Sequence, residues 1–84
     1  MQSIFINTVR KKNSMKPKIG TILKQLRKSK NLSVDDVANF FIKNDILISN
    51  KTIYGWENDF AYPSINKFLL LCELYEIKDI TIFK

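Results

Sequence analysis

Histidine is absent from this sequence of 84 residues, and cysteine occurs only once. Histidine is the side chain that most often transfers protons in enzymes, and a single cysteine leaves too few ligands for the usual zinc sites. No acid–base or nucleophile constellation is visible, so we expect neither an enzyme nor a bound cofactor or metal. A lone cysteine forms no intramolecular disulfide, which fits a reducing cytoplasm.

Long apolar runs, glycine and proline are also scarce. No stretch approaches the ~18 apolar residues of a membrane helix, so no transmembrane span is expected. With two glycines and two prolines, few positions interrupt a helix. Apolar residues nevertheless make up 45% of the chain, which is enough for the core of one small domain.

Acidic residues are missing from residues 1–30, which carry nine lysines and arginines. Residues 31–84 carry five bases and eight acids, so the net charge of +6 comes from the first part of the chain. Such a concentrated positive field suits a polyanion, either nucleic acid or an anionic membrane surface. Residues 1–15 combine a weakly strand-like "SIFINTV" with a basic "RKKNS". We expect them to form a flexible basic arm ahead of one domain in residues 16–84.

The spacing of apolar residues predicts two helices in the first half of the domain. In the first, from about residue 17 to 31, one apolar stripe recurs at i, i+3, i+4 and i+7: Ile19, Ile22, Leu23 and Leu26. Asn31 can end this helix in a left-handed conformation. The second opens at Ser33, with Asp36 at the spacing of a capping box, and runs to about Lys43 or Asn44. Its buried side is predicted to hold Val37, Ala38, Phe40 and Phe41.

Three shorter helices are predicted in the second half. Ser49 and Ser64 are the N-cap candidates of the first two. In residues 50–58 only Ile53 and Trp56 clearly belong to a core. The next helix has an apolar stripe that we expect to be buried: Ile65, Phe68, Leu69 and Cys72. A short fifth helix from about residue 78 carries Ile80, Ile82 and Phe83.

The helix in residues 50–58 has the features of a recognition helix. It is short, it keeps few core residues, and its N-terminal turn is polar. The DNA major groove is about 12 Å wide and admits one helix whose N-terminal residues face the base edges.

Four stretches in this order resemble the phage repressor and Cro-type helix-turn-helix family, also called the xenobiotic-response-element type: "LR", "LSVDDVA", "KTIYGWEN" and "YPSINKFLLLCELY". The resemblance runs from about residue 19 to 80. It implies an all-α, compact five-helix bundle like that of lambda repressor. It further implies a cytoplasmic bacterial or phage protein that binds operator DNA, usually as a dimer.

The resemblance also implies roles for particular residues. Trp56 stands at a core position, and Glu57 stands where relatives pair with an arginine of the first helix, here Arg27. There are departures from the pattern. About five extra residues within "FIKNDILI" lengthen the second helix or the turn after it, Gly55 replaces a side chain that often reads a base, and Val34 replaces a polar residue.

Exposed polar residues on and near the third helix are the candidates for DNA contact. Asn50 can pair with adenine and Lys51 with guanine, whereas Tyr54 suits a thymine methyl or a phosphate. Phosphate contacts are expected from nine residues: Ser49, Thr52, Asn58, Lys67, Lys24, Lys28, Arg10, Lys11 and Lys12. Each could instead be a solvated surface residue without a partner.

The partner and the function remain open between two classes. The first is a sequence-specific transcriptional regulator, a repressor, that binds a palindromic operator as a homodimer formed in solution or on DNA. Its dimer contacts would come from Ile80, Ile82 and Phe83, unless these three cover the core of the monomer. The alternative is a protein-interaction module of the same fold, which binds another regulator or acts like an antitoxin.

Overall fold

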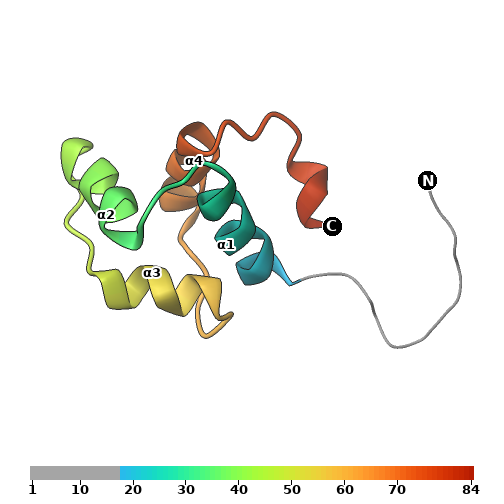
Figure 1. The fold of residues 1–84 in the computed structure, drawn as a ribbon, viewed down its shortest axis with the longest axis horizontal. Helices are drawn as coiled ribbons and strands as arrows, with labels where there is room; N and C mark the ends of the chain where they lie inside the picture. The colour runs from blue at the N-terminus through green and yellow to red at the C-terminus, as the bar shows by residue number, and fades with distance from the viewer. Residues whose placement is uncertain (1–17) are drawn as a thin grey trace, which may run out of the picture.

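A computed structural model of the protein describes residues 18–84. The described chain folds into four α-helices and one short 3-10 helix, η3 (Figure 1): α1 Ile19–Ser29, α2 Val34–Lys43, α3 Asn50–Glu57, α4 Ile65–Leu74 and η3 Ile80–Phe83. The all-helical prediction is confirmed for this part of the chain. The count of five helices is not, because the last element is a single 3-10 turn. The expected phosphate contacts of Arg10, Lys11 and Lys12 lie outside the described residues.

Serine side chains begin three of the four α-helices, as predicted. The Ser33 hydroxyl accepts a hydrogen bond from the backbone of Asp36 at 3.0 Å, and the Asp36 carboxylate accepts one from the backbone of Ser33 at 2.8 Å. This closed capping box lowers the pKa of the Asp36 carboxyl. Ser49 and Ser64 each accept a hydrogen bond from the backbone of the third helical residue. Local hydrogen bonds therefore fix where α2, α3 and α4 begin.

All four α-helices end in the same way, without a glycine. The residue after each C-cap has a positive φ between 57° and 64°: Asn31, Asp45, Asp59 and Glu76. The backbone N–H of each of these residues, and that of the residue after it, donate to carbonyls of the last helical turn, which is the Schellman pattern. Asn31 thus ends α1 as predicted. Polar residues in the left-handed region let a chain with so little glycine make four tight helix ends.

The core lies where the four α-helices meet. Its fully buried side chains come from all of them: Leu23, Val37, Phe41, Ile53 and Leu71. The Trp56 ring packs edge-on against Phe41, with 5.8 Å between the ring centroids. Because α3 supplies both Ile53 and Trp56, one short helix is anchored against α1 and α2 by two apolar side chains.

The predicted buried face of α4 is wrong in part. Ile65 and Leu69 are exposed and Cys72 is only half-buried, whereas Leu71 and Tyr75 are buried. The unbroken apolar run "FLLLC" is compatible with two different faces of a helix, so its periodicity does not choose between them. Packing selects the face that continues, one turn beyond Leu71, into Tyr75 at the end of the helix.

The extra residues between α2 and α3 lengthen the connection rather than the helix. Residues 44–49 join the two helices, and Ile46 and Ile48 pack against the core from this segment. Leu47, between them, is almost fully exposed. The two isoleucines hold the longer connection against the domain, so α3 keeps its packing on α1 and α2.

Candidate nucleic-acid interface

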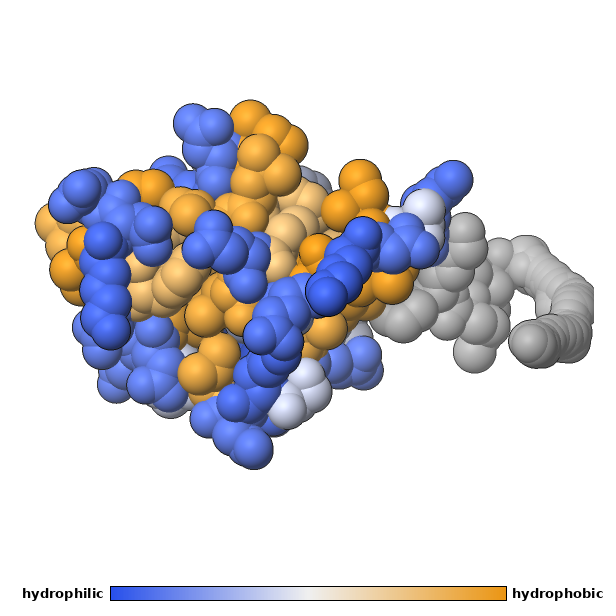
Figure 2. Space-filling model, turned by 90° about the horizontal axis from the view of Figure 1, so that it is seen from above, coloured by the Kyte–Doolittle hydropathy of each residue, from blue (hydrophilic) through white to orange (hydrophobic). Residues whose placement is uncertain are grey.

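Helix α3 forms one edge of the domain, below α1 and α2 in Figure 1. Its inner side buries Ile53, Trp56 and Glu57. The residues expected to contact DNA lie on its solvent-exposed side or at its ends: Ser49, Asn50, Lys51, Thr52, Tyr54 and Asn58. On the opposite side of the molecule, apolar and hydrophilic side chains are intermixed (Figure 2). Helix α3 thus packs on the domain through buried side chains and exposes mostly polar side chains to solvent.

The N-terminal end of α3 is held by several hydrogen bonds. The Ser49 hydroxyl accepts from the Thr52 backbone at 3.2 Å and lies 3.1 Å from the Thr52 hydroxyl. The Asn50 amide donates to the Asp35 carboxylate of α2 at 2.5 Å. An ionised carboxylate only accepts, so the amide nitrogen of Asn50 must face Asp35. This leaves its carbonyl oxygen and one N–H free for another partner.

Asp35 was not among the residues expected at this site. It stands beside Asp36 in the first turn of α2, and both acids suit the positive end of that helix. No sequence signal connects it to Asn50, because the two residues meet only through the packing of α2 on α3. The contact fixes the orientation of Asn50 and places a negative charge next to the N-terminal end of α3.

The other expected contacts are distributed over three helices. Asn58 donates its amide to the Tyr54 carbonyl at 2.8 Å, so one of its N–H groups is used at the end of α3. Lys24 and Lys28 are exposed and one turn apart on α1. Lys67 is half-buried, in the first turn of α4. Lys24 and Lys28 are free to reach a phosphate.

A buried ion pair joins the C-terminal end of α3 to α1. Arg27 donates from Nε to Glu57 Oε2 at 2.8 Å and from Nη2 to Oε1 at 3.0 Å, and its Nη1 donates to the Leu32 carbonyl at 2.9 Å. The two residues are only 8% and 6% exposed. The hydrogen bonds to Glu57 raise the pKa of the guanidinium. Burial and the charge of Glu57 raise the pKa of the adjacent, buried Tyr75 hydroxyl.

A second link between α1 and α3 was missed in the sequence. The backbone N–H of Gly20 donates to the Asp59 carboxylate at 3.0 Å, which satisfies a free N–H in the first turn of α1. A Cβ atom at Gly20 would lie 2.4 Å from the Trp56 carbonyl oxygen and 2.7 Å from that of Glu57. The sequence does contain a signal for this link, namely Gly20 itself. A glycine within a helix is costly, so it indicates that another part of the chain packs closely against the helix backbone.

Comparison with known proteins decides the family. A family model described as a helix-turn-helix domain matches residues 20–83, which include all four α-helices apart from the first residue of α1. The chain belongs to this helix-turn-helix family. The match agrees with the resemblance to phage repressor and Cro-type domains found in the sequence. No curated protein and no solved structure matches the chain.

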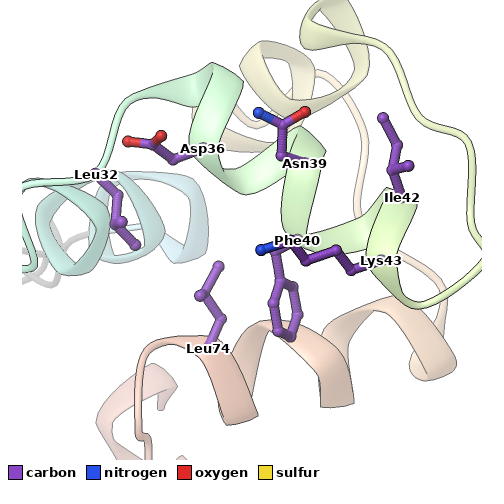
Figure 3. A pocket seen from close by; sticks show the side chains of 7 residues that line it. All are labelled: Leu32, Asp36, Asn39, Phe40, Ile42, Lys43 and Leu74. Atoms are coloured by element: carbon purple, nitrogen blue, oxygen red, sulfur yellow. The ribbon is translucent and has the colours of Figure 1, made fainter.

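The helix-turn-helix domain also has an open groove of about 570 Å³ between α2 and α4, lined by Leu32, Asp36, Asn39, Phe40, Ile42, Lys43 and Leu74. Phe40 and Leu74 point into the gap between the helices (Figure 3). The carboxylate of Asp36 is already used by the capping box. Residues 18–84 contain no cluster of three or more histidine, cysteine or acidic side chains that could hold a metal. Nor do they contain a helix with the length and apolar character needed to cross a membrane.

Proposed function

We propose that this protein is a sequence-specific DNA-binding transcriptional regulator, a repressor, that inserts α3 into the major groove. The observation that carries the proposal is the division of α3 into two sides. Its inner side is anchored by the Arg27–Glu57 ion pair and the packing of Trp56, whereas Asn50, Lys51 and Tyr54 are exposed. A rigid helix with an exposed polar N-terminal turn can present side chains to base edges.

Within this proposal, Asn50 and Lys51 distinguish bases. The bond to Asp35 leaves Asn50 an acceptor oxygen and one N–H, the two groups that pair with N6 and N7 of adenine. Lys51 donates to guanine, and Tyr54 contacts a thymine methyl or a phosphate. Gly55 adds no side chain to the interface, so these few residues carry most of the discrimination.

Phosphate contacts position the domain and carry no sequence information. We assign them to Lys24 and Lys28 on α1, to Lys67, and to the polar groups at the ends of α3: Ser49, Thr52 and Asn58. The basic arm, with Arg10, Lys11 and Lys12, adds further phosphate contacts.

The readout prediction separates base contacts from phosphate contacts. Asn50→Ala or Lys51→Ala is expected to cost about 1–3 kcal/mol on the operator and little on random DNA, because a lost base contact affects only specific binding. Lys24→Ala, the matched control, is expected to weaken binding to both DNAs equally. Selection from a randomised duplex pool supplies the operator, and titrations of each variant on both DNAs give the affinities.

If Asn50→Ala and Lys51→Ala both keep the full ratio of operator to random affinity, α3 does not read the bases. The second candidate function, a protein-interaction module, is then favoured. One observation already supports that candidate: the Asp35 carboxylate lies against Asn50 at the proposed reading end, where it opposes the approach of phosphates.

A separate prediction concerns the arm. Deleting residues 1–14 removes three of the nine basic residues in the first 30. Binding is expected to weaken, and the slope of log affinity against log salt is expected to fall by about 0.9 for each lost phosphate contact. Titrations at several salt concentrations measure the slope, and an unchanged slope would show that the arm does not touch DNA.

We also propose that the protein binds a palindromic operator as a homodimer. Two half-sites that lie about 34 Å apart on one face of the duplex would each receive one α3. The dimer then combines the binding free energies of two short helices, neither of which offers many base contacts alone.

A further inference from the structure

Four large apolar side chains stand out to solvent just after α3. Phe60 and Tyr62, in the connection to α4, are 86% and 64% exposed, and Ile65 and Leu69 of α4 are 68% and 57% exposed. We call these four residues the loop–α4 surface. Ile65 and Leu69 are one turn apart on the same side of α4. Exposed apolar side chains grouped along a short segment mark interaction sites.

The backbone of the exposed residue Phe60 is fixed by a hydrogen bond. Its N–H donates to the Gly55 carbonyl at 2.9 Å, as part of the helix end after Asp59. An apolar residue at this position commonly packs back onto the preceding helix. Here the ring stays exposed on a backbone that is fixed by hydrogen bonds. Fixed exposure lowers the entropy cost of burying the ring against a partner.

The segment that carries this surface holds almost no charge between Asp59, which precedes it, and Glu73, which follows it. Residues 60–72 contain a single charged residue, Lys67, which is half-buried. The whole chain carries a net charge of +6, so two copies repel each other over most orientations. In a two-fold contact, each residue on the axis meets its own copy, and like charges there are costly. An uncharged apolar surface is the kind that a basic protein can use to meet itself.

The apolar residues near the C-terminal end of the chain fit this role less well. Ile80 and Ile82 lie among charged neighbours, with Lys78 and Asp79 before them and Lys84 after them. Phe83 packs against Phe68 of the same chain, with 5.2 Å between the ring centroids. The contact with Phe68 uses one of the three residues from which the sequence predicted a dimer interface.

We propose that a second copy of this chain docks on the loop–α4 surface, in a two-fold contact centred on Phe60, Tyr62, Ile65 and Leu69. This inference rests on the proposed function in one respect: the docking surface would bring the α3 helices of two copies to one operator. The loop begins at the last turn of α3, so a contact there couples the two reading helices directly.

The test compares two exposed apolar positions in the full chain. Leu69→Glu places a charge on the loop–α4 surface, and Ile80→Glu places one at a similarly exposed residue outside it. Sedimentation velocity over a range of concentrations is run without DNA and with a palindromic duplex from the pool selection. We expect the wild-type chain and Ile80→Glu to dimerise alike, and Leu69→Glu to dimerise about tenfold more weakly or worse.

A second variant guards against a folding defect. Phe60→Arg changes the loop and leaves both neighbouring helices intact, and circular dichroism melting reports whether each variant is folded. Phe60→Arg is expected to weaken the dimer as Leu69→Glu does. The proposal is overturned if the wild-type chain stays monomeric with and without DNA. It is equally overturned if folded Leu69→Glu and Phe60→Arg dimerise like wild type, or if Ile80→Glu alone breaks the dimer.

The experiments distinguish a failure of the docking surface from a failure of the DNA-binding proposal. A chain that selects a DNA motif but binds it one-to-one contradicts the docking surface and the proposed homodimer, and leaves the DNA-binding proposal intact. A chain that dimerises through the loop–α4 surface but selects no motif contradicts the DNA-binding proposal alone.

Discussion

Glu57→Ala is expected to lower the free energy of unfolding by about 3–5 kcal/mol, because it leaves the buried guanidinium of Arg27 without its partner. A small domain is stable by only about 5–15 kcal/mol, so much of its stability would be lost. For a chain of this size each kcal/mol corresponds to about 4–8 °C in melting temperature. Thermal melting followed by circular dichroism is therefore expected to show a drop of at least about 12 °C.

The second ion pair of the described chain supplies the control. Lys30 and Glu76 approach to 2.5 Å between the ends of α1 and α4, but both residues are exposed. Exposed pairs contribute little, since water and salt screen them and two long side chains must be ordered. Glu76→Ala is expected to leave the melting temperature almost unchanged. A Glu57→Ala variant that melts within about 3 °C of wild type would show that the Arg27 pair is not required for stability.

The helix boundaries could be predicted because their signals are local. Ser33, Ser49 and Ser64 each cap a helix with a hydrogen bond to a residue three positions later. Asn31 ends α1 through bonds to α1 itself. Contacts over so few residues depend on the identity of neighbours in the sequence, so a reader of the sequence can recognise them.

The details of packing could not be predicted in the same way. The buried side of α4 depends on Leu71 and Tyr75, which a continuous apolar run does not distinguish from Leu69 and Cys72. The contact of Asn50 with Asp35 spans 15 residues and exists only once α2 lies against α3. Such contacts arise from the arrangement of helices, which periodicity within one helix does not contain.

Gly20→Ala is expected to destabilise the protein, although alanine favours a helix by about 1 kcal/mol over glycine. The added Cβ would lie 2.4 Å from the Trp56 carbonyl oxygen, and a backbone atom cannot rotate away as a side chain can. Overpacking of this kind costs about 1–3 kcal/mol. Separating the helices also weakens the hydrogen bond from Gly20 to Asp59, so we expect a net loss of about 2 kcal/mol in denaturant unfolding.

Gly55→Ala is the matched variant, because a Cβ built at Gly55 has no atom within 4 Å. With no steric cost, the helix preference of alanine is expected to act alone and to stabilise the protein by about 1 kcal/mol. The two substitutions are chemically identical, so any difference in sign must come from the contact between α1 and the end of α3. If Gly20→Ala stabilised the protein as much as Gly55→Ala, α1 and α3 could not approach as closely as the structure places them. The anchor that holds α3 would then rest on the Arg27–Glu57 pair and the buried side chains alone.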